Sequence, residues 1–363
     1  MIISTTLTGS NADIIGDAIA SVVDQVDRCL VIDTGAQDAS IEVARAVAGE
    51  KFLPREYPWK NDFAAARNFA LQAATEAGGS WAVTVDTDER LVFDRGFDLH
   101  AELARTGAHV LLVNDDGGHY AKERIIRLPA SVRWNAPTHE VLEGQRAGFS
   151  ETLPGVRFRE LPKDPAALKR KFERDVAILK KYTRQHGKQP RWFYYLGASH
   201  QDLGEYAAAI DAYRACAQLG GWPEEGAWAC YRAADCCCKL NRWADAIHFC
   251  VAGLAIRPAT AELAWLAGYA AYKAGRYEDA IAWSNMAIAN GLHEGQGARF
   301  PRIGFRFPTA LYEGPYDVLR WAHKALGNAD AAAEAERKFE QARKSREAAN
   351  APGAVTIAGR TGN

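Results

Sequence analysis

Residues 28–40 read RCLVIDTGAQDAS, an apolar run followed by an aspartate, a glycine turn and a second aspartate. The run 28–32 predicts a buried strand, and the periodic apolar residues of 40–48 predict a helix. The first 150 residues continue this alternation, with further strands expected at 1–7, 51–57, 81–85 and 110–113 and further helices at 13–26 and 62–77. This alternation predicts an α/β domain of Rossmann-like type, with a mostly parallel sheet covered on both faces.

Polar residues that follow the strands are the first candidates for a site, because ligands bind beyond the carboxyl ends of parallel strands. Two acidic clusters occupy such places, DTGAQD at 33–38 and DTDE at 86–89. Asp86 and Asp88 are hard oxygen donors with no cysteine nearby, which suits Mg²⁺ or Mn²⁺. Taken alone, a D-x-D sequence is more often a solvated acidic turn.

Composition and missing motifs exclude several classes of protein. The chain has 44 basic and 45 acidic residues, and no basic stripe, which argues against nucleic acid as a partner. It has no G-x-G-x-x-G after the first expected strand and no G-x-x-x-x-G-K-[ST] sequence. No apolar run approaches the ~20 residues of a transmembrane segment, and the first residues lack the pattern of a signal peptide, so a cytoplasmic location is the default expectation.

The sequence from about residue 165 onward is predicted to be helical, and it repeats. Ala209, Ala246 and Ala280 are equivalent small residues, 37 and 34 residues apart. A period near 34, with small residues at helix crossings and Tyr or Trp near the turn, is typical of tetratricopeptide repeats. A fourth, degenerate unit from about 315 to 344 is predicted to cap the array. The seven cysteines are interpreted as small apolar side chains at helix interfaces.

These patterns predict four segments. They are an α/β catalytic domain at 1–150, a helical linker at 151–190, the repeats with their degenerate cap at 191–345, and a disordered tail at 346–363.

Four motifs of the first domain together resemble the inverting glycosyltransferases of family 2, which have a nucleotide-diphospho-sugar-binding fold. They are RCLVIDTGAQDAS, the segment WKNDFAAARNFAL at 59–71, VTVDTDERL with its D-x-D, and RIIRLPASVRWNAPTHEVLEG, which contains a His-Glu pair. The second motif is similar to a subset that includes lipopolysaccharide-core glucosyltransferases and peptide S-glycosyltransferases. The linker and first repeat also resemble bacterial family 2 enzymes fused to tetratricopeptide repeats. One departure is the loop 8–13, where the family usually has an Asn-Glu pair.

The resemblance implies a nucleotide pocket at the ends of the first two strands. Asp33 matches the position that hydrogen-bonds the pyrimidine base, and Thr5 and Leu7 would line the base and ribose. Gly35 lets the backbone turn tightly near the nucleotide. Asp38 is equally compatible with capping the next helix.

The same resemblance places the diphosphate and the metal near the third and fourth strands. Arg67 and Asn68 would contact the diphosphate or the sugar, although an ion pair of Arg67 with Asp62 or Asp86 is the alternative. Lys60 would assist the diphosphate or remain a solvated loop lysine. The Mn²⁺ or Mg²⁺ ion would be held by three side chains, namely Asp86, Asp88 and His139, with a contact to the diphosphate as the alternative for His139.

An inverting transfer also needs a general base to take the proton of the acceptor. Glu140 is the candidate, with a structural contact as its alternative, and Asp115 and Asp116 are held in reserve. Arg124 and Arg127 would bind a charged part of the donor or acceptor, or be solvated.

The resulting hypothesis is an enzyme that moves a hexose from a nucleotide-diphospho-sugar, with a UDP-sugar favoured, to a peptide or protein held partly by the repeats. A saccharide or lipid-linked envelope glycan is the alternative acceptor. The second hypothesis is an inactive sugar-nucleotide-binding scaffold that uses its repeats for protein interaction. The presence of both Asp88 and Glu140 favours the enzyme.

Overall fold

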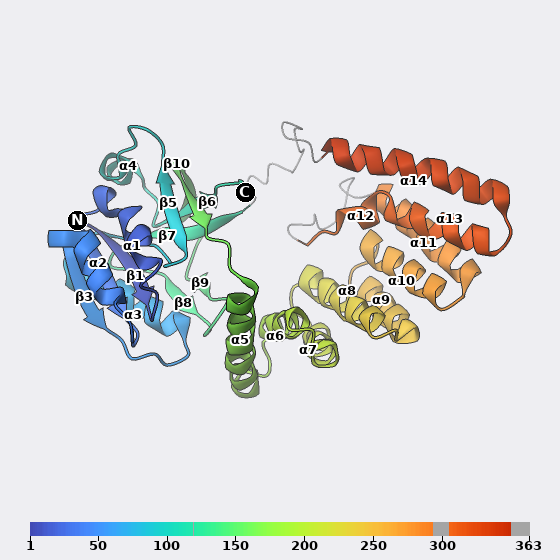
Figure 1. The fold of residues 1–363 in the computed structure, drawn as a ribbon, viewed down its shortest axis with the longest axis horizontal. Helices are drawn as coiled ribbons and strands as arrows, with labels where there is room; N and C mark the ends of the chain where they lie inside the picture. Colours follow the sequence, from blue (N-terminus) through green and yellow to red (C-terminus); the bar gives the residue numbers. More distant parts are fainter. Residues whose placement is uncertain (119, 293–304, 350–363) are drawn as a thin grey trace. The chain divides into compact units, whose positions relative to one another are not determined.

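The computed structural model describes residues 1–118, 120–292 and 305–349, and the chain divides into two compact units, 1–168 and 169–363. Figure 1 shows an α/β unit followed by a unit built from helices. Both halves of the expected fold class are therefore confirmed.

The first unit is built on an eight-stranded mixed sheet in the order β3-β2-β1-β4-β7-β6-β10-β5. Its first four strands in this order are parallel, as the sequence predicts, whereas β7 runs antiparallel to both of its neighbours. The strands are β1 (Ile2–Thr8), β2 (Arg28–Asp33), β3 (Phe52–Glu56), β4 (Trp81–Thr84), β5 (Glu89–Phe93), β6 (Val110–Asp115), β7 (Ala121–Arg127) and β10 (Ser150–Glu160).

Alternate residues of each strand supply two separate hydrophobic cores, one on each face of the sheet. Ile2 and Val31 pack with α1 (Ile15–Ala20), α2 (Ser40–Ala48) and α4 (Leu99–Arg105) on one face. Ile3 and Leu30 pack with α3 (Phe63–Glu76) and the two-stranded ribbon of β8 (Arg133–Asn135) and β9 (Val141–Glu143) on the other. Covering both faces leaves the strand ends as the place where polar side chains gather.

Two sequence expectations about this unit are wrong. The helix expected at 13–26 ends at Ala20 and resumes only as a 3₁₀ turn at Val23–Gln25. The linker expected from residue 151 begins with β10, which lies inside the main sheet between β6 and β5. Helix α5 (Pro165–Gln185) follows it. The strand was missed although its charged and apolar residues alternate as a strand requires, and its Leu153, Val156 and Phe158 are buried in the core beneath α1, α2 and α4.

The second unit stacks helix pairs, as the repeat period predicts. The pairs are α6 (Pro190–Asp202) with α7 (Tyr206–Leu219), α8 (Pro223–Lys239) with α9 (Trp243–Ile256), α10 (Ala261–Lys273) with α11 (Tyr277–Leu292), and α13 (Gly314–Ala325) with α14 (Ala329–Ala349). The short α12 (Pro308–Leu311) precedes the last pair. The expected tail at 346–363 is wrong at its start, since α14 continues to Ala349, and the rest of it lies outside the described residues.

Small side chains hold the helix pairs together. Gly197 faces the ring of Tyr213, Gly253 faces Leu263, and Gly268 faces Ser284, each so closely that a Cβ would lie within 3 Å of the neighbouring side chain. The six cysteines of the repeats lie on helices; five of them are buried and Cys238 is half-buried, in agreement with packing at helix interfaces, whereas Cys29 is buried in β2 of the sheet. Burial raises the pKa of the Cys216 thiol to about 12, which keeps it protonated and unreactive.

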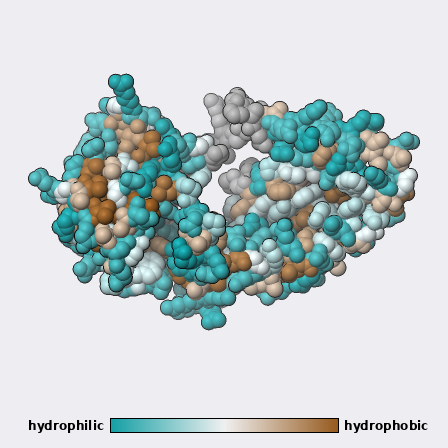
Figure 2. All heavy atoms as spheres, in the orientation of Figure 1, coloured by the Kyte–Doolittle hydropathy of each residue, from teal (hydrophilic) through white to brown (hydrophobic). Residues whose placement is uncertain are grey.

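Hydrophilic residues cover much of the visible surface of each unit (Figure 2). Among the described residues, no helix combines the length and apolar character that crossing a membrane requires.

We expect Gly197→Ala to destabilise the repeat unit by about 1–3 kcal/mol, the usual cost of overpacking. The new Cβ would lie 2.7 Å from the Tyr213 ring, which is fully buried and held by hydrogen bonds from its hydroxyl to Gln201 and from Arg232. Gly226→Ala is the matched control, because its Cβ would meet only Ile256 at 3.8 Å. Chemical denaturation should show a neutral or slightly stabilising effect of the control, and equal effects of both variants would contradict the packing argument.

Candidate active site

The carboxyl ends of β1, β2 and β4 meet at one edge of the sheet. In the parallel register Thr8 is opposite Asp33, and Thr5 is opposite Thr84. The loop after β2 and the D-x-D loop after β4 therefore emerge on either side of the loop after β1. This is the edge at which the sequence predicts the site.

Asp33 ends β2 and closes the turn that follows it. Its Oδ1 accepts hydrogen bonds from the backbone N–H groups of Gly35 and Ala36, both at 2.8 Å. Gly35 has φ +113°, a backbone conformation that favours glycine. Asp38 likewise ties loops together, because its carboxylate accepts from the N–H groups of Ala12 and Ser40. The contact of Asp33 with a base stays a prediction.

The contact of Thr5 with the nucleotide stays a prediction. β1 extends to Thr8, so Thr5 lies inside the sheet, buried, with its Oγ1 3.4 Å from the Oγ1 of Thr84. Leu7 is half-buried and packs against the core on the α3 face. The sequence places the end of this strand at Leu7, one residue before the end of β1, and Thr5, Thr6 and Thr8 are all buried.

Arg67 of α3 is the centre of the polar residues at this edge. Its guanidinium pairs with Asp86, at 2.9 Å between Nη1 and Oδ1, and with Glu140, at 2.6 Å between Nε and Oε1. Arg124 of β7 also contacts Asp86, at 3.1 Å from Nη2 to Oδ2. Although burial opposes ionisation, Arg67 and Arg124 hold the pKa of Asp86 well below its ordinary range.

The ion pairs continue from Arg124 along the sheet. Arg124 pairs with Glu89, Glu89 with Lys122 at 2.8 Å, and Lys122 with Glu160. Glu89 and Arg124 are almost completely buried. Seven side chains thus alternate in charge across the unit, in the order Glu140, Arg67, Asp86, Arg124, Glu89, Lys122 and Glu160. We call them the ion-pair chain.

The two aspartates of the D-x-D sequence have different surroundings. Both oxygens of Asp86 contact guanidinium groups inside the ion-pair chain. Asp88 instead pairs with the partly exposed Lys163 at 2.6 Å, and its backbone oxygen accepts from the N–H of Leu161 at 2.8 Å. Of the two, Asp88 is the carboxylate whose partner can move aside for a cation.

A three-residue metal cage does not fit these surroundings. In the described part of the chain, no group of three or more His, Cys, Asp and Glu side chains is arranged to hold a metal ion. Asp86 is unsuited as a ligand because two guanidinium groups already use its charge. Mg²⁺ is commonly held by one or two carboxylates together with substrate phosphates. The residues present therefore fit an ion held through Asp88 and a diphosphate, and a contact of His139 with the metal stays a prediction.

The loop that carries His139 and Glu140 is held in an unusual backbone conformation. Ala136 has φ +80° and His139 has φ +50°, and such positions outside glycine cost of order 1–3 kcal/mol unless their surroundings enforce them. One such enforcing contact is the hydrogen bond from the N–H of Phe63, at the start of α3, to the oxygen of Pro137 at 2.8 Å. Arg67, on the same helix as Phe63, then holds Glu140 in place through a salt bridge.

Asn68 has a structural role that the sequence did not predict. Its Nδ2 donates to the backbone oxygen of Trp134 at 2.8 Å, and its Oδ1 accepts from the N–H of Trp134 at 3.0 Å. The amide thereby pairs with β8 as a neighbouring strand would. The contact of Asn68 with the diphosphate or the sugar stays a prediction, and it would have to use the second N–H of an amide that already pairs with Trp134.

The remaining predicted residues lie apart from the ion-pair chain. Lys60 is exposed, with its Nζ 5.2 Å from the centroid of the Tyr57 ring, and its contact with diphosphate stays a prediction. Asp115 accepts from N–H groups in its own turn, and Asp116 pairs with Arg157 and Arg159. Arg127 donates to the backbone oxygens of residues 106 and 108 and covers the ring of Trp81. Asp115 and Asp116, the reserve candidates for the general base, are therefore engaged in contacts within their own turn and with arginines.

The sequence missed Glu89, Lys122 and Lys163. Glu89 directly follows the D-x-D sequence, and Lys122 is two residues before Arg124 on the same face of β7, so a reading of strand alternation would have found both. Nothing near Lys163 in the sequence indicates its pairing with Asp88.

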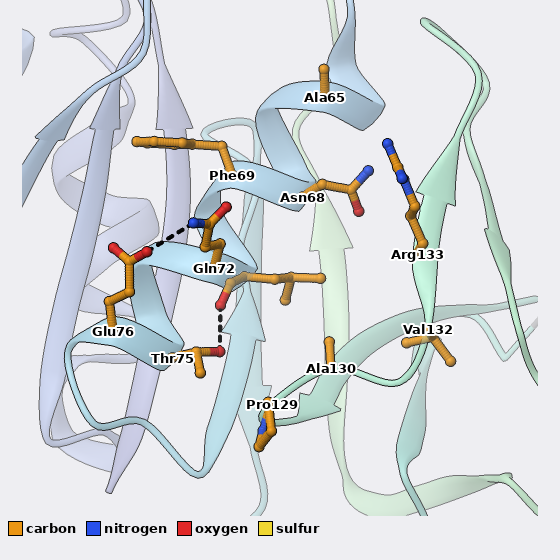
Figure 3. A pocket seen from close by; sticks show the side chains of 11 residues that line it. Ala65, Asn68, Phe69, Gln72, Thr75, Glu76, Pro129, Ala130, Val132 and Arg133 are labelled. Carbon is orange, nitrogen blue, oxygen red and sulfur yellow. Dashed lines mark hydrogen bonds between the residues drawn. The ribbon is translucent and has the colours of Figure 1, made fainter.

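A surface pocket of about 650 Å³ lies between α3 and residues 129–133. Asn68 and Arg133 stand on opposite sides of it, and the hydrogen-bonded pair of Gln72 and Glu76 lines its far end (Figure 3). Of the site residues predicted from the sequence, Asn68 lines this pocket. The pocket is therefore distinct from the carboxylates of the ion-pair chain.

Comparison with known proteins gives the class of the first unit. Residues 2–144 match the family described as "Glycosyl transferase family 2". The first unit is a family 2 glycosyltransferase domain, and it is followed by helical repeats of the tetratricopeptide type.

Two curated relatives and one solved structure are similar to parts of the chain. A TPR repeat-containing protein of Synechococcus elongatus is 32% identical over 157 residues, which cover 42% of this chain and 38% of that protein. The SPbeta prophage-derived glycosyltransferase SunS of Bacillus subtilis is 22% identical over 207 residues, covering 53% of this chain and 47% of that protein. The crystal structure of MamA is 17% identical with a TM-score of 0.40, covering 52% of this chain and 99% of that one. The chain thus spans less than half the length of either curated relative.

We expect Asp86→Asn to lower the free energy of unfolding by about 2–3 kcal/mol, because it leaves two guanidinium groups without their shared charge. Because the pKa of Asp86 is lowered in the folded protein, its ionised carboxylate adds to the free energy of unfolding at pH values above the ordinary 3.8. This contribution is lost progressively as the pH falls below 3.8 towards the lowered pKa. The gap between wild type and variant should therefore narrow in buffers below 3.8. Asp116→Asn is the control, since its exposed pairs with arginines should contribute less than about 1 kcal/mol. A gap that stays constant with pH would contradict the pairing.

Proposed function

We propose that this chain is an inverting glycosyltransferase that moves a hexose from a nucleotide-diphospho-sugar, with UDP as the favoured nucleotide, to a peptide or protein acceptor. The observation that carries the proposal is the position of Asp88, an accessible carboxylate at the carboxyl edge of a family 2 domain, next to a loop fixed by buried ion pairs. Ligands of such sheets bind at this edge.

Asp88 would hold Mg²⁺ or Mn²⁺ together with the diphosphate. Such an ion neutralises charge on the departing nucleoside diphosphate. Lys163 is 2.6 Å from Asp88 and would either leave for the cation or turn to a phosphate oxygen. Asp86 would act indirectly, because its pairing with Arg67 and Arg124 fixes the loop from which Asp88 projects.

Glu140 is proposed as the general base. Arg67 uses one of its oxygens, Oε1, so the second oxygen is the one that would receive the proton of the acceptor. The salt bridge also keeps the carboxylate in one orientation, which proton transfer in the transition state requires. Arg67 is accordingly a positioning residue.

The peptide or protein acceptor is favoured because tetratricopeptide arrays generally bind peptides. A saccharide or lipid-linked glycan is the alternative acceptor. An inactive scaffold is the alternative for the whole chain, and measurable turnover of a nucleotide-sugar would exclude it.

We expect Asp88→Asn to abolish both sugar transfer and metal-stimulated hydrolysis of a UDP-sugar while leaving the unfolding midpoint nearly unchanged. The midpoint should change little because the side chain of Asp88 is partly exposed and makes an ion pair at the surface. EDTA should have the same effect on the wild type, and added Mn²⁺ should reverse it. Asp94→Asn, which loses a comparable exposed pair with Arg157, should keep full activity. Full activity of the wild type in chelator would remove the metal from the proposal.

We expect Glu140→Gln to lower kcat by roughly 10²–10⁴-fold while donor affinity changes little, since glutamine keeps the shape but cannot accept a proton. Hydrolysis of the donor by water should fall in parallel. Glu143→Gln, on the neighbouring strand β9, is the matched control. If the Glu140 variant instead kept its kcat and raised the KM for acceptor, Glu140 would be an acceptor-positioning residue.

A further inference from the structure

The first helices of the repeats carry a short segment of the same chain on their surface. Phe305 stacks on Trp228, with ring centroids 5.6 Å apart and planes at 10°, and it also contacts Tyr194 at 5.4 Å. Two residues later, Phe307 stacks on Trp265 at 5.2 Å and lies 6.2 Å from Tyr231. The segment thus crosses from α6 to α10. These first helices lie side by side (Figure 1).

The rings beneath the segment belong to the repeat itself. Tyr194, Tyr231 and Trp265 occupy equivalent positions, 37 and 34 residues apart. Each is followed three residues later by a small residue, Gly197, Ala234 or Gly268. The repeat therefore places an aromatic ring at regular intervals along one face. We call Tyr194, Trp228, Tyr231 and Trp265 the aromatic face.

Buried carboxylates accompany these rings. Glu224 and Glu225 begin α8 and Glu262 begins α10, and all three are at most 5% exposed. Glu224 lies 3.8 Å from the guanidinium of Arg306, and Glu262 accepts a hydrogen bond from the backbone N–H of Phe307 at 3.3 Å. Burial raises the pKa of Glu225. A face that combines stacked rings with desolvated acids favours a cation between two aromatic side chains.

The segment itself is held less firmly than the core of the repeats. Residues 305–307 belong to no helix or strand, both phenylalanine rings are only half-buried, and Arg306 is exposed. The rings of the aromatic face, by contrast, stand on helices, and Tyr194, Trp228 and Tyr231 are at most 8% exposed. The face is a property of the folded repeats, and the segment is an extended strip laid on it.

We propose that the aromatic face is a binding site for an extended peptide with the pattern aromatic–basic–aromatic, and that Phe305-Arg306-Phe307 is an internal occupant that such a peptide must displace. The pairs of rings supply apolar and stacking contacts. Glu224 selects the basic residue, and Glu262 binds a backbone N–H that any peptide offers. This inference does not depend on the chemistry of sugar transfer.

Tethering explains why the internal segment occupies the face although its side chains are only partly buried. A short tether gives an effective concentration of the order of millimolar, so a weak segment fills the site most of the time. A peptide added in solution then binds with an affinity reduced by the fraction of molecules in which the face is open. Weakening the internal segment should therefore raise the affinity for an added peptide.

The test uses the full chain and a fluorescent peptide of sequence FRFPTAL, which copies residues 305–311. Fluorescence anisotropy should show at least tenfold tighter binding to the double variant Phe305→Ser/Phe307→Ser than to the wild type. Arg306→Glu keeps both rings and opposes Glu224, so it should show the same trend without loss of folded structure. Two control peptides, one with serine at both phenylalanines and one with glutamate for the arginine, should bind at least tenfold more weakly to the variants.

Three results would overturn the proposal. The folded variants could bind the peptide no better than the wild type does. The serine-substituted peptide could bind as well as the parent peptide. Both Arg306→Glu and the double variant could lose the cooperative unfolding of the repeats by circular dichroism, which would make the segment a permanent part of the core.

Discussion

The first unit depends on one buried guanidinium. Arg67 lies between Asp86 and Glu140, and these three residues come from a helix, the loop after β4 and the loop after β8. Burying a charge is tolerated only when partners surround it, and removing one partner of such a pair is more costly than never having had the pair. The position of Arg67 therefore fixes the two loops that carry Asp88 and Glu140. It also explains why helix α3 and the β8–β9 ribbon lie on the same face of the sheet.

The antiparallel strand β7 makes this arrangement possible. By inserting between β4 and β6 it places Arg124 beside Asp86 and Lys122 beside Glu89. The purely parallel part of the sheet would leave the carboxylate of Asp86 with a single arginine. Two arginines around Asp86 separate the roles of the D-x-D pair, since one aspartate becomes part of the scaffold and the other faces the site.

The repeat unit follows a different principle, in which small side chains determine close approach and large rings fill what remains. Gly197 allows Tyr213 to pack directly on α6, and the hydroxyl of Tyr213 joins Gln201 and Arg232. The same period that places small residues at crossings also places an aromatic ring on each first helix, three residues before Gly197, Ala234 or Gly268. One sequence pattern thus provides both a core and the aromatic face.

The sequence by itself determined the elements that depend on short-range patterns. Alternation and helical periodicity predicted β1 to β4, α2 and α3, and the spacing of Ala209, Ala246 and Ala280 predicted the repeats. The sequence also predicted that Asp88, Arg67 and Glu140 belong to one site at the carboxyl edge of the sheet. Only the tertiary structure decided their partners, because Arg67 and Glu140 are 73 residues apart and the sheet order that joins them is not visible in any local pattern. For the same reason the roles of Asn68 and Thr5, the strand β10 and the seat of Phe305 on the repeats were beyond sequence reasoning. Each depends on which surfaces a distant segment covers.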